Sequence, residues 1–116
     1  MLQIADITLQ NNVFLAPMSG VSDLPFRTTV FELGAGLVIS EMIASEELAR
    51  ERPDVVLRAR HDATLKPFAM QLAGREARWM AEGARLAEGA GADIIDIKMG
   101  CPARKVTGAL SGSALM

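Results

Sequence analysis

The chain has 116 residues, of which 50% are hydrophobic and 22% charged, and its formal net charge is −2 at pH 7. This composition is typical of a globular protein and excludes a disordered one. No apolar run approaches the roughly 18 residues of a membrane-spanning helix, and the start of the chain lacks the basic segment of a secretory signal. The slight acidity is only a weak argument against nucleic-acid binding, because basic residues can be locally concentrated.

The chain contains one cysteine and one histidine. This count excludes an internal disulfide framework and argues against a zinc site, so we expect no bound metal. A lone thiol without an export signal favours a reducing environment. We therefore expect a cytoplasmic protein without a membrane segment.

The first half of the chain alternates short apolar segments with amphipathic ones. Residues 4–9 alternate in polarity and an Asn-Asn pair follows them, which predicts a small hairpin leading into a first core strand at 13–16. Asp23 or the serine before it can cap a helix that Gly34 ends. The branched, apolar residues 37–39 predict a buried strand.

The second half continues this alternation. A further helix begins at Ser45, whereas the polar segment 50–66 favours no single assignment. Residues 68–72 predict a strand, and 76–88 predict an amphipathic helix with one small, apolar stripe. Residues 94–97 form the next predicted strand. The chain then continues as a glycine-punctuated loop, at the end of which a helix begins.

Nearly all-apolar strands alternating with helices indicate a parallel sheet covered by helices. Four core strands are predicted, beginning near Val13, Leu37, Phe68 and Ile94. An eight-stranded β/α barrel needs about 250 residues, so four such units amount to half of one. We therefore predict an α/β fold: the N-terminal half of a truncated (β/α)8 TIM barrel, with parallel strands and the helices outside, over residues 1–116.

In parallel α/β folds, functional groups gather where strands end. Pro17 and Met18 follow the first strand and offer either a rigid loop with a flat thioether against an aromatic ring, or a plain turn with a core methionine. Gln71 interrupts an apolar strand, where an unpaired amide would cost about 1–3 kcal/mol. It therefore bonds either the polar edge of an imide-like ligand or the backbone. Glu41 is either a ligand contact or a satisfied carboxylate.

Cys101 lies between a glycine and a proline on the loop after the last strand. Buried cysteines are mostly inert, but these neighbours fix the loop and indicate a positioned thiol. A Cys-His nucleophile would depend on His61 alone, which we expect to be an exposed loop residue. A thiol with a pKa of about 8.5 is mostly protonated at pH 7, so a general acid is the favoured role. Arg104 and Lys105 on the same loop contact substrate phosphates or form a solvated pair.

Together these segments resemble the tRNA-dihydrouridine synthases, in particular their bacterial branch. The resemblance covers essentially the whole chain in order and spacing. Its main motifs are Ala-Pro-Met-Ser-Gly at 16–20, Ser-Glu-Met at 40–42, Gln-Leu-Ala-Gly at 71–74 and Met-Gly-Cys-Pro at 99–102.

This resemblance implies a flavin-dependent barrel enzyme that reduces the 5,6 double bond of uridine in tRNA. It implies that Pro17, Met18 and Ser19 hold the FMN ring and that Gln71 bonds the polar edge of that ring. Cys101 would protonate uracil C5 while reduced flavin delivers hydride to C6, and NADPH would reduce the flavin again.

The resemblance also implies that residue 98 lies beside the substrate ring, where the family carries asparagine and this chain has Lys98. Lys98, Arg104 and Lys105 are the expected substrate contacts. The family's flavin-phosphate contacts and helical tRNA-binding domain would lie beyond residue 116. Two alternatives stay open: another FMN barrel that reduces a free pyrimidine or an enone, and a fragment without activity of its own.

Overall fold

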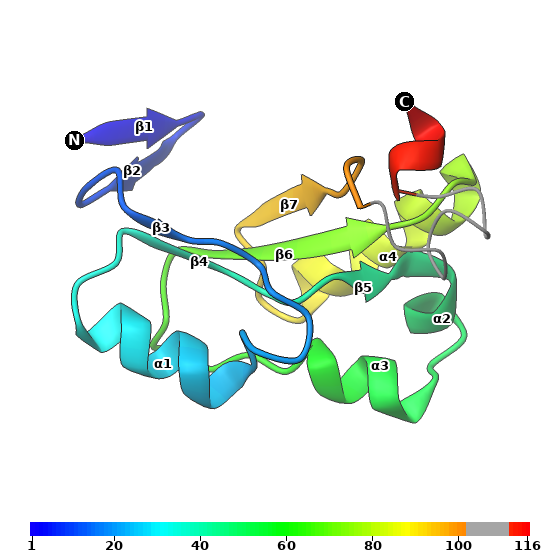
Figure 1. Ribbon diagram of the computed structural model, residues 1–116, viewed down its shortest axis with the longest axis horizontal. Coiled ribbons are helices and arrows are strands. Elements are labelled where there is room, and N and C mark those ends of the chain that lie inside the picture. The colour runs from blue at the N-terminus through cyan, green and yellow to red at the C-terminus, as the bar shows by residue number, and fades with distance from the viewer. Residues whose placement is uncertain (102–111) are drawn as a thin grey trace.

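A computed structural model of the chain describes residues 1–101 and 112–116. Its central sheet has five strands, all paired in parallel (Figure 1). In chain order these strands are β3 (Phe14–Leu15), β4 (Leu37–Ile39), β5 (Ile43–Ala44), β6 (Phe68–Ala73) and β7 (Ile94–Ile97). The β/α order and the parallel pairing confirm the predicted fold class.

Two of the strands, β4 and β5, share one position in the sheet. Ile39 of β4 lies opposite Ala69, and Ile43 of β5 lies opposite Leu72 further along the same edge of β6. They therefore form one line that is interrupted at residues 40–42. With β3, β6 and β7, this line gives the four strand positions that the sequence predicts for half a barrel.

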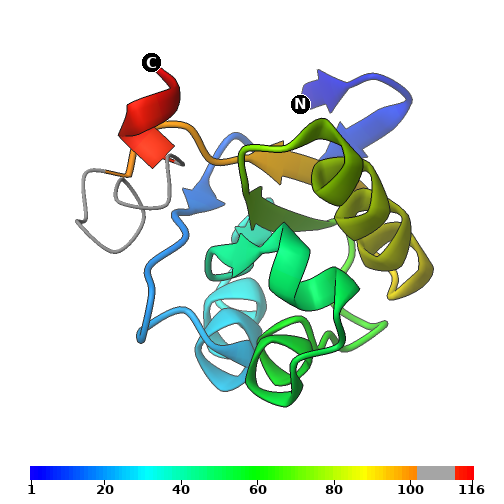
Figure 2. The ribbon, with the colours of Figure 1, turned by 90° about the vertical axis from the view of Figure 1, so that its right-hand side faces the viewer.

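The helices lie on one side of the sheet, as Figure 2 shows from the carboxyl ends of the strands. Their shared apolar core includes Val38, Phe68, Met70 and Leu72 from the sheet. The helices are α1 (Leu24–Glu32), α2 (Ser45–Ala49), α3 (Pro53–Arg58) and α4 (Ala77–Gly89). Sequence patterns predict α1, α2 and α4, but not α3, which lies inside the unassigned polar segment. No helix in the described part of the chain is long and apolar enough to cross a membrane.

The N-terminal hairpin differs from the prediction. Strands β1 (Leu2–Ile4) and β2 (Ile7–Leu9) pair antiparallel around a two-residue turn at 5–6. The prediction of a turn at the Asn-Asn pair is wrong, because the side chain of Asn11 bonds two other segments of the backbone. Its Nδ2 donates to the carbonyl of Gly34 over 2.8 Å, and its Oδ1 accepts from the Val13 amide over 2.9 Å. Asn11 thereby joins the start of β3 to the end of α1.

The inner face of the sheet, opposite the helices, is organised in layers. Ile39, Ala69 and Ile94 lie at one level and pack with residues of the hairpin. Side chains alternate between faces, so the next inward level lies two residues closer to the carboxyl ends. At that level Gln71 of β6 lies directly opposite Asp96 of β7. An apolar layer is thus followed by a polar one.

Candidate active site at the carboxyl ends of the strands

Gln71 is the centre of the polar layer. Only 5% of this residue is exposed, and its Nε2 donates to Oδ2 of Asp96 over 2.7 Å. Its backbone amide donates to the hydroxyl of Ser40 over 3.0 Å. The sequence leaves open whether Gln71 bonds the backbone or a ligand, but its side-chain nitrogen bonds a neighbouring carboxylate instead.

The break between β4 and β5 arises at Ser40 and Glu41. The backbone amide of Ser40 donates to the Ala69 carbonyl. The Gln71 amide of β6 donates to the Ser40 hydroxyl instead of to a backbone carbonyl. Glu41 is buried, and its Oε1 accepts from the backbone amide of Gly20. Of the two roles considered for Glu41, the structure shows a satisfied carboxylate that holds the loop after β3.

The loop after β3 carries the predicted flavin-binding residues. Ser22 is fully buried, and its Oγ accepts from the Met18 amide over 2.8 Å and donates to the Met18 carbonyl over 3.1 Å. Met18 itself is 38% exposed, so it is not a core methionine. Pro17 is half-buried and Ser19 exposed. The loop therefore has a fixed backbone and presents a thioether at the carboxyl edge of the sheet.

Arg27 of α1 bonds the backbone of this loop, a role that the sequence patterns did not predict. It is 1% exposed, and it donates to the carbonyl of Ser22 over 2.7 Å and to that of Arg60 over 2.9 Å. Burial lowers the pKa of Arg27, and the carboxylates of Glu41 and Asp23 oppose that shift. The available signal was its spacing: Arg27 lies one turn before apolar residues of α1 that pack on the core.

Cys101 and Lys98 follow β7 at the same edge. Cys101 is a half-buried free thiol, and its carbonyl accepts from the amide of Ser113 over 2.9 Å. Ser113 belongs to the 3₁₀ helix η1 (Gly112–Leu115), where the sequence predicts the start of a helix. Lys98 is half-buried and donates its backbone amide to Leu72 over 2.9 Å. Arg104 and Lys105 lie outside the described residues.

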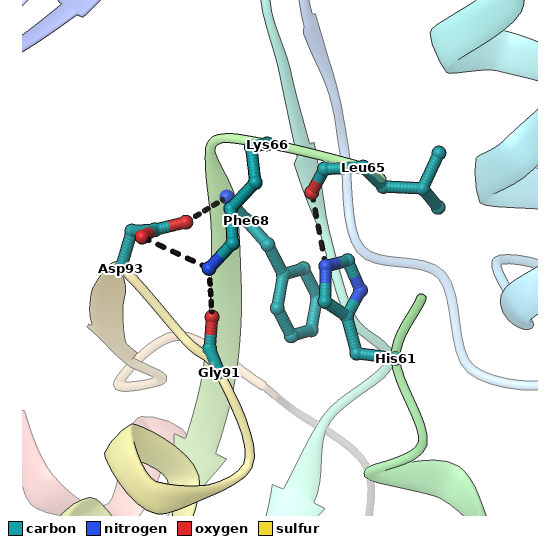
Figure 3. A network of polar contacts seen from close by, with 6 residues as sticks. All are labelled: His61, Leu65, Lys66, Phe68, Gly91 and Asp93. Carbon is teal, nitrogen blue, oxygen red and sulfur yellow. Dashed lines mark hydrogen bonds and ion pairs between the residues drawn. The ribbon is translucent and has the colours of Figure 1, made fainter. Parts of the chain in front are cut away.

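His61 is not the exposed loop residue that the sequence predicts. Its ring stacks on Phe68 with 3.6 Å between centroids and 7° between planes, and its Nε2 lies 2.9 Å from the Leu65 carbonyl (Figure 3). Its Nδ1 is buried without a hydrogen-bond partner in the described structure. Burial lowers the pKa of His61. Phe68 begins β6, so His61 lies at the amino end of the sheet and is not paired with Cys101.

Asp93 fixes the register on which the site depends. Its Oδ2 accepts from the Phe68 amide over 2.9 Å (Figure 3). Its own amide donates to the Phe68 carbonyl over 2.9 Å. Lys66 adds an ion pair to Asp93 Oδ1 at 3.2 Å. These contacts align the starts of β6 and β7, and that alignment sets Gln71 opposite Asp96.

The fold and the site together define a class. A parallel sheet with helices outside, an apolar inner layer and polar side chains at the carboxyl ends is the arrangement of β/α-barrel enzymes. Within the described residues no three His, Cys, Asp or Glu side chains converge as a metal site would require. The sequence matches the dihydrouridine synthase family over residues 14–116, and the chain belongs to that family.

Similar proteins carry consistent names. The chain is 56% identical over 110 residues to the probable tRNA-dihydrouridine synthase of Rhizobium leguminosarum bv. phaseoli, covering 95% of this chain and 34% of that protein. It is 53% identical over 116 residues to the probable tRNA-dihydrouridine synthase of Rhodobacter capsulatus, covering 99% and 36%. Identity to tRNA-dihydrouridine synthase B of Pseudomonas putida is 47% over 115 residues, covering 99% and 34%. The chain thus spans about a third of the length of these curated relatives.

Proposed function

We propose that residues 1–116 are the N-terminal portion of an FMN-binding TIM-barrel catalytic domain that reduces uridine in tRNA to 5,6-dihydrouridine. The observation that carries this proposal is the polar layer at the carboxyl ends of the strands, in a chain of the dihydrouridine synthase family. The names of the relatives support tRNA as the substrate.

The residues at this edge fit a flavin ring. Met18 offers an exposed, polarisable thioether on a loop whose backbone Ser22 fixes, and such sulfur atoms contact aromatic rings favourably. The side-chain nitrogen of Gln71 bonds Asp96, so its carbonyl oxygen is the atom available to the edge of the ring. In this proposal Pro17, Met18 and Ser19 hold the ring and Gln71 bonds its polar edge. When bound, FMN that NADPH has reduced supplies the hydride for uracil C6.

The chain itself supplies the proton. Reduction of the C5–C6 double bond adds one hydride and one proton, and the proton goes to C5 from the Cys101 sulfur. Cys101 is half-buried, and its carbonyl accepts from the Ser113 amide, a bond that holds the backbone carrying the thiol. A general acid needs only a protonated, correctly placed donor.

Three basic residues after β7 are the proposed substrate contacts: Lys98, Arg104 and Lys105. Lys98 follows Asp96 by two residues and is half-buried at the carboxyl edge. Cationic side chains there suit the phosphates of an RNA substrate. We also propose a cytoplasmic location, where tRNA is available.

The test uses a chimera in which residues 1–116 replace the matching segment of the Rhizobium leguminosarum relative. We expect the chimera to bind FMN, to oxidise NADPH and to form dihydrouridine in tRNA that lacks this modification. The natural relative, prepared in the same way, is the control. Reoxidation of the reduced flavin by free uracil or by an enone as fast as by tRNA would favour another flavin barrel. The 116-residue chain tested alone shows whether it has activity by itself.

A further inference from the structure

We infer that Asp96 is a positioning residue that fixes the orientation of the Gln71 amide, so that Gln71 presents its carbonyl oxygen to the ligand. This inference rests on the proposed function, because it takes the ligand to be a flavin. It begins from the 2.7 Å contact between Gln71 Nε2 and Asp96 Oδ2.

The direction of this hydrogen bond follows from chemistry. A carboxylate accepts hydrogen bonds and an amide nitrogen donates them, so the nitrogen of Gln71 must face Asp96. A flipped amide would place two acceptor oxygens against each other. A distance of 2.7 Å is typical of a charge-assisted bond, which is about twice as strong as a neutral one. Asp96 therefore selects one of the two amide orientations.

The surroundings of Gln71 hold its side chain in the orientation that Asp96 selects. The residue is 5% exposed and its backbone amide is held by Ser40, so the side chain has little room to turn. None of the described residues donates to Gln71 Oε1. Within the described structure Oε1 of Gln71 is not among the fully buried side-chain atoms without a partner, which belong to Arg27 and His61, so it is the amide atom left for a ligand.

A ligand group that meets this oxygen must be a hydrogen-bond donor. The polar edge of a flavin carries one imide N–H between two carbonyl oxygens, and that N–H is the matching group. With the amide flipped, Gln71 would instead present its NH2 group and match a carbonyl. Asp96 thus determines which atom of the ring edge Gln71 binds, without touching the ring.

The first experiment needs no flavin. In the ¹⁵N-labelled 116-residue chain, we measure hydrogen exchange of the Gln71 side-chain NH2 group by NMR. We expect Asp96→Asn to accelerate this exchange about tenfold, because the lost bond to a charged acceptor is of that size, and Asp96→Glu to restore slow exchange in part. Asp54→Asn, which removes an exposed carboxylate of α3 that pairs with Arg52, is the matched control. Unchanged exchange in Asp96→Asn would overturn the inference.

The second experiment tests the ligand. The chimera is titrated with FMN and with FMN methylated at the imide nitrogen, and binding is followed by flavin fluorescence. We expect about tenfold tighter binding of FMN, a preference that Asp96→Asn abolishes and Asp54→Asn retains. Equal binding of both flavins by the unchanged chimera would overturn the inference. If neither flavin binds, the proposed function fails, while the exchange experiment still decides the orientation of Gln71.

Discussion

The two ends of the parallel sheet use polar side chains in opposite ways. At the amino end, the carboxylate of Asp93 bonds both the Phe68 amide and the Lys66 ammonium, and Lys66 also donates to the Gly91 carbonyl over 2.7 Å. At the carboxyl end, the Gln71 amide bonds Asp96 through its nitrogen while its oxygen meets no donor among the described residues. Asp93 and Lys66 thus bond groups of the fold itself, whereas Gln71 keeps one amide oxygen available.

This difference separates stability from function. In β/α barrels, the ends of strands that carry catalytic loops are distinct from the ends that hold the fold together. Here the amino-end contacts of Asp93 set the register, and the carboxyl-end residues then meet at one level. We therefore expect substitutions at the amino end to change the free energy of unfolding, and those at the carboxyl end to change ligand binding and chemistry.

The largest expected effect is that of Cys101→Ala in the chimera. Loss of a positioned general acid costs on the order of 10²–10⁴-fold in rate. We expect that loss in the reoxidation of reduced flavin by tRNA, with flavin reduction by NADPH unchanged, both measured by stopped-flow absorbance. Equal losses in the two half-reactions would make Cys101 a structural residue.

Arg27→Met tests the support behind the loop after β3. Methionine fills much of the buried space but leaves the carbonyls of Ser22 and Arg60 without their donor. Each unsatisfied group costs about 1–3 kcal/mol, so we expect the free energy of unfolding in urea to fall by about 2–6 kcal/mol. The control is Arg85→Met, which removes an exposed ion pair with Glu82 and is expected to cost less than about 1 kcal/mol.

A smaller effect is expected from Lys98→Asn. Asparagine both donates to and accepts from a uracil edge, whereas an ammonium only donates. We expect Lys98→Asn to accelerate flavin reoxidation by tRNA about two- to tenfold, the value of one neutral hydrogen bond. Arg85→Asn, which removes an exposed cation on α4, is the control and should leave this rate unchanged. A slower Lys98→Asn variant would show that the cation contributes favourably to substrate binding.

Much of the fold is predictable from the sequence because its signals are local. The apolar runs at 37–39 and 94–97 and the cap at Asp23 predict β4, β7 and α1 closely. The short helix α3 has no such signal, since it lies in a polar segment. Strand β5 has only two residues and forms because the Ser40 hydroxyl bridges the break before it, a contact between distant segments that no local pattern encodes.

The candidate site is predictable as residue types but not as pairs. A buried glutamine at a strand end indicates that it has a partner, and the parallel register then decides that this partner is Asp96. Arg27 and His61 were missed for the same reason. Each packs against Phe68, which lies far from Arg27 in the sequence and is brought onto His61 by the path of the polar segment between them.

The last prediction concerns His61 at the amino end, where the expected effect is confined to one pH range. Burial lowers the pKa of His61 in the folded chain, the nearby cations of Arg27 and Lys66 lower it further, and the Leu65 carbonyl and Asp62 oppose this shift. In the unfolded chain the histidine titrates near its ordinary pKa of about 6.5, so the unfolded state binds the proton more tightly. The free energy of unfolding is therefore expected to be highest above about pH 6.5, to fall as pH drops through that value, and to level off below the folded pKa.

His61→Phe keeps a ring on Phe68 and removes the titrating group. We expect urea unfolding of the 116-residue chain, followed by circular dichroism from pH 8 to 5, to show this decline in the unchanged chain and to lack it in His61→Phe. Because Thr64 lowers the pKa of the exposed Asp62, that carboxylate acts at lower pH and does not obscure the result. Because His61 contacts Phe68 and Leu65 and takes no part in the Asp93 contacts that set the register, the flavin preference assigned to Gln71 should stay the same when the chimera carries this substitution. A changed preference would show that the two ends of the sheet are not independent.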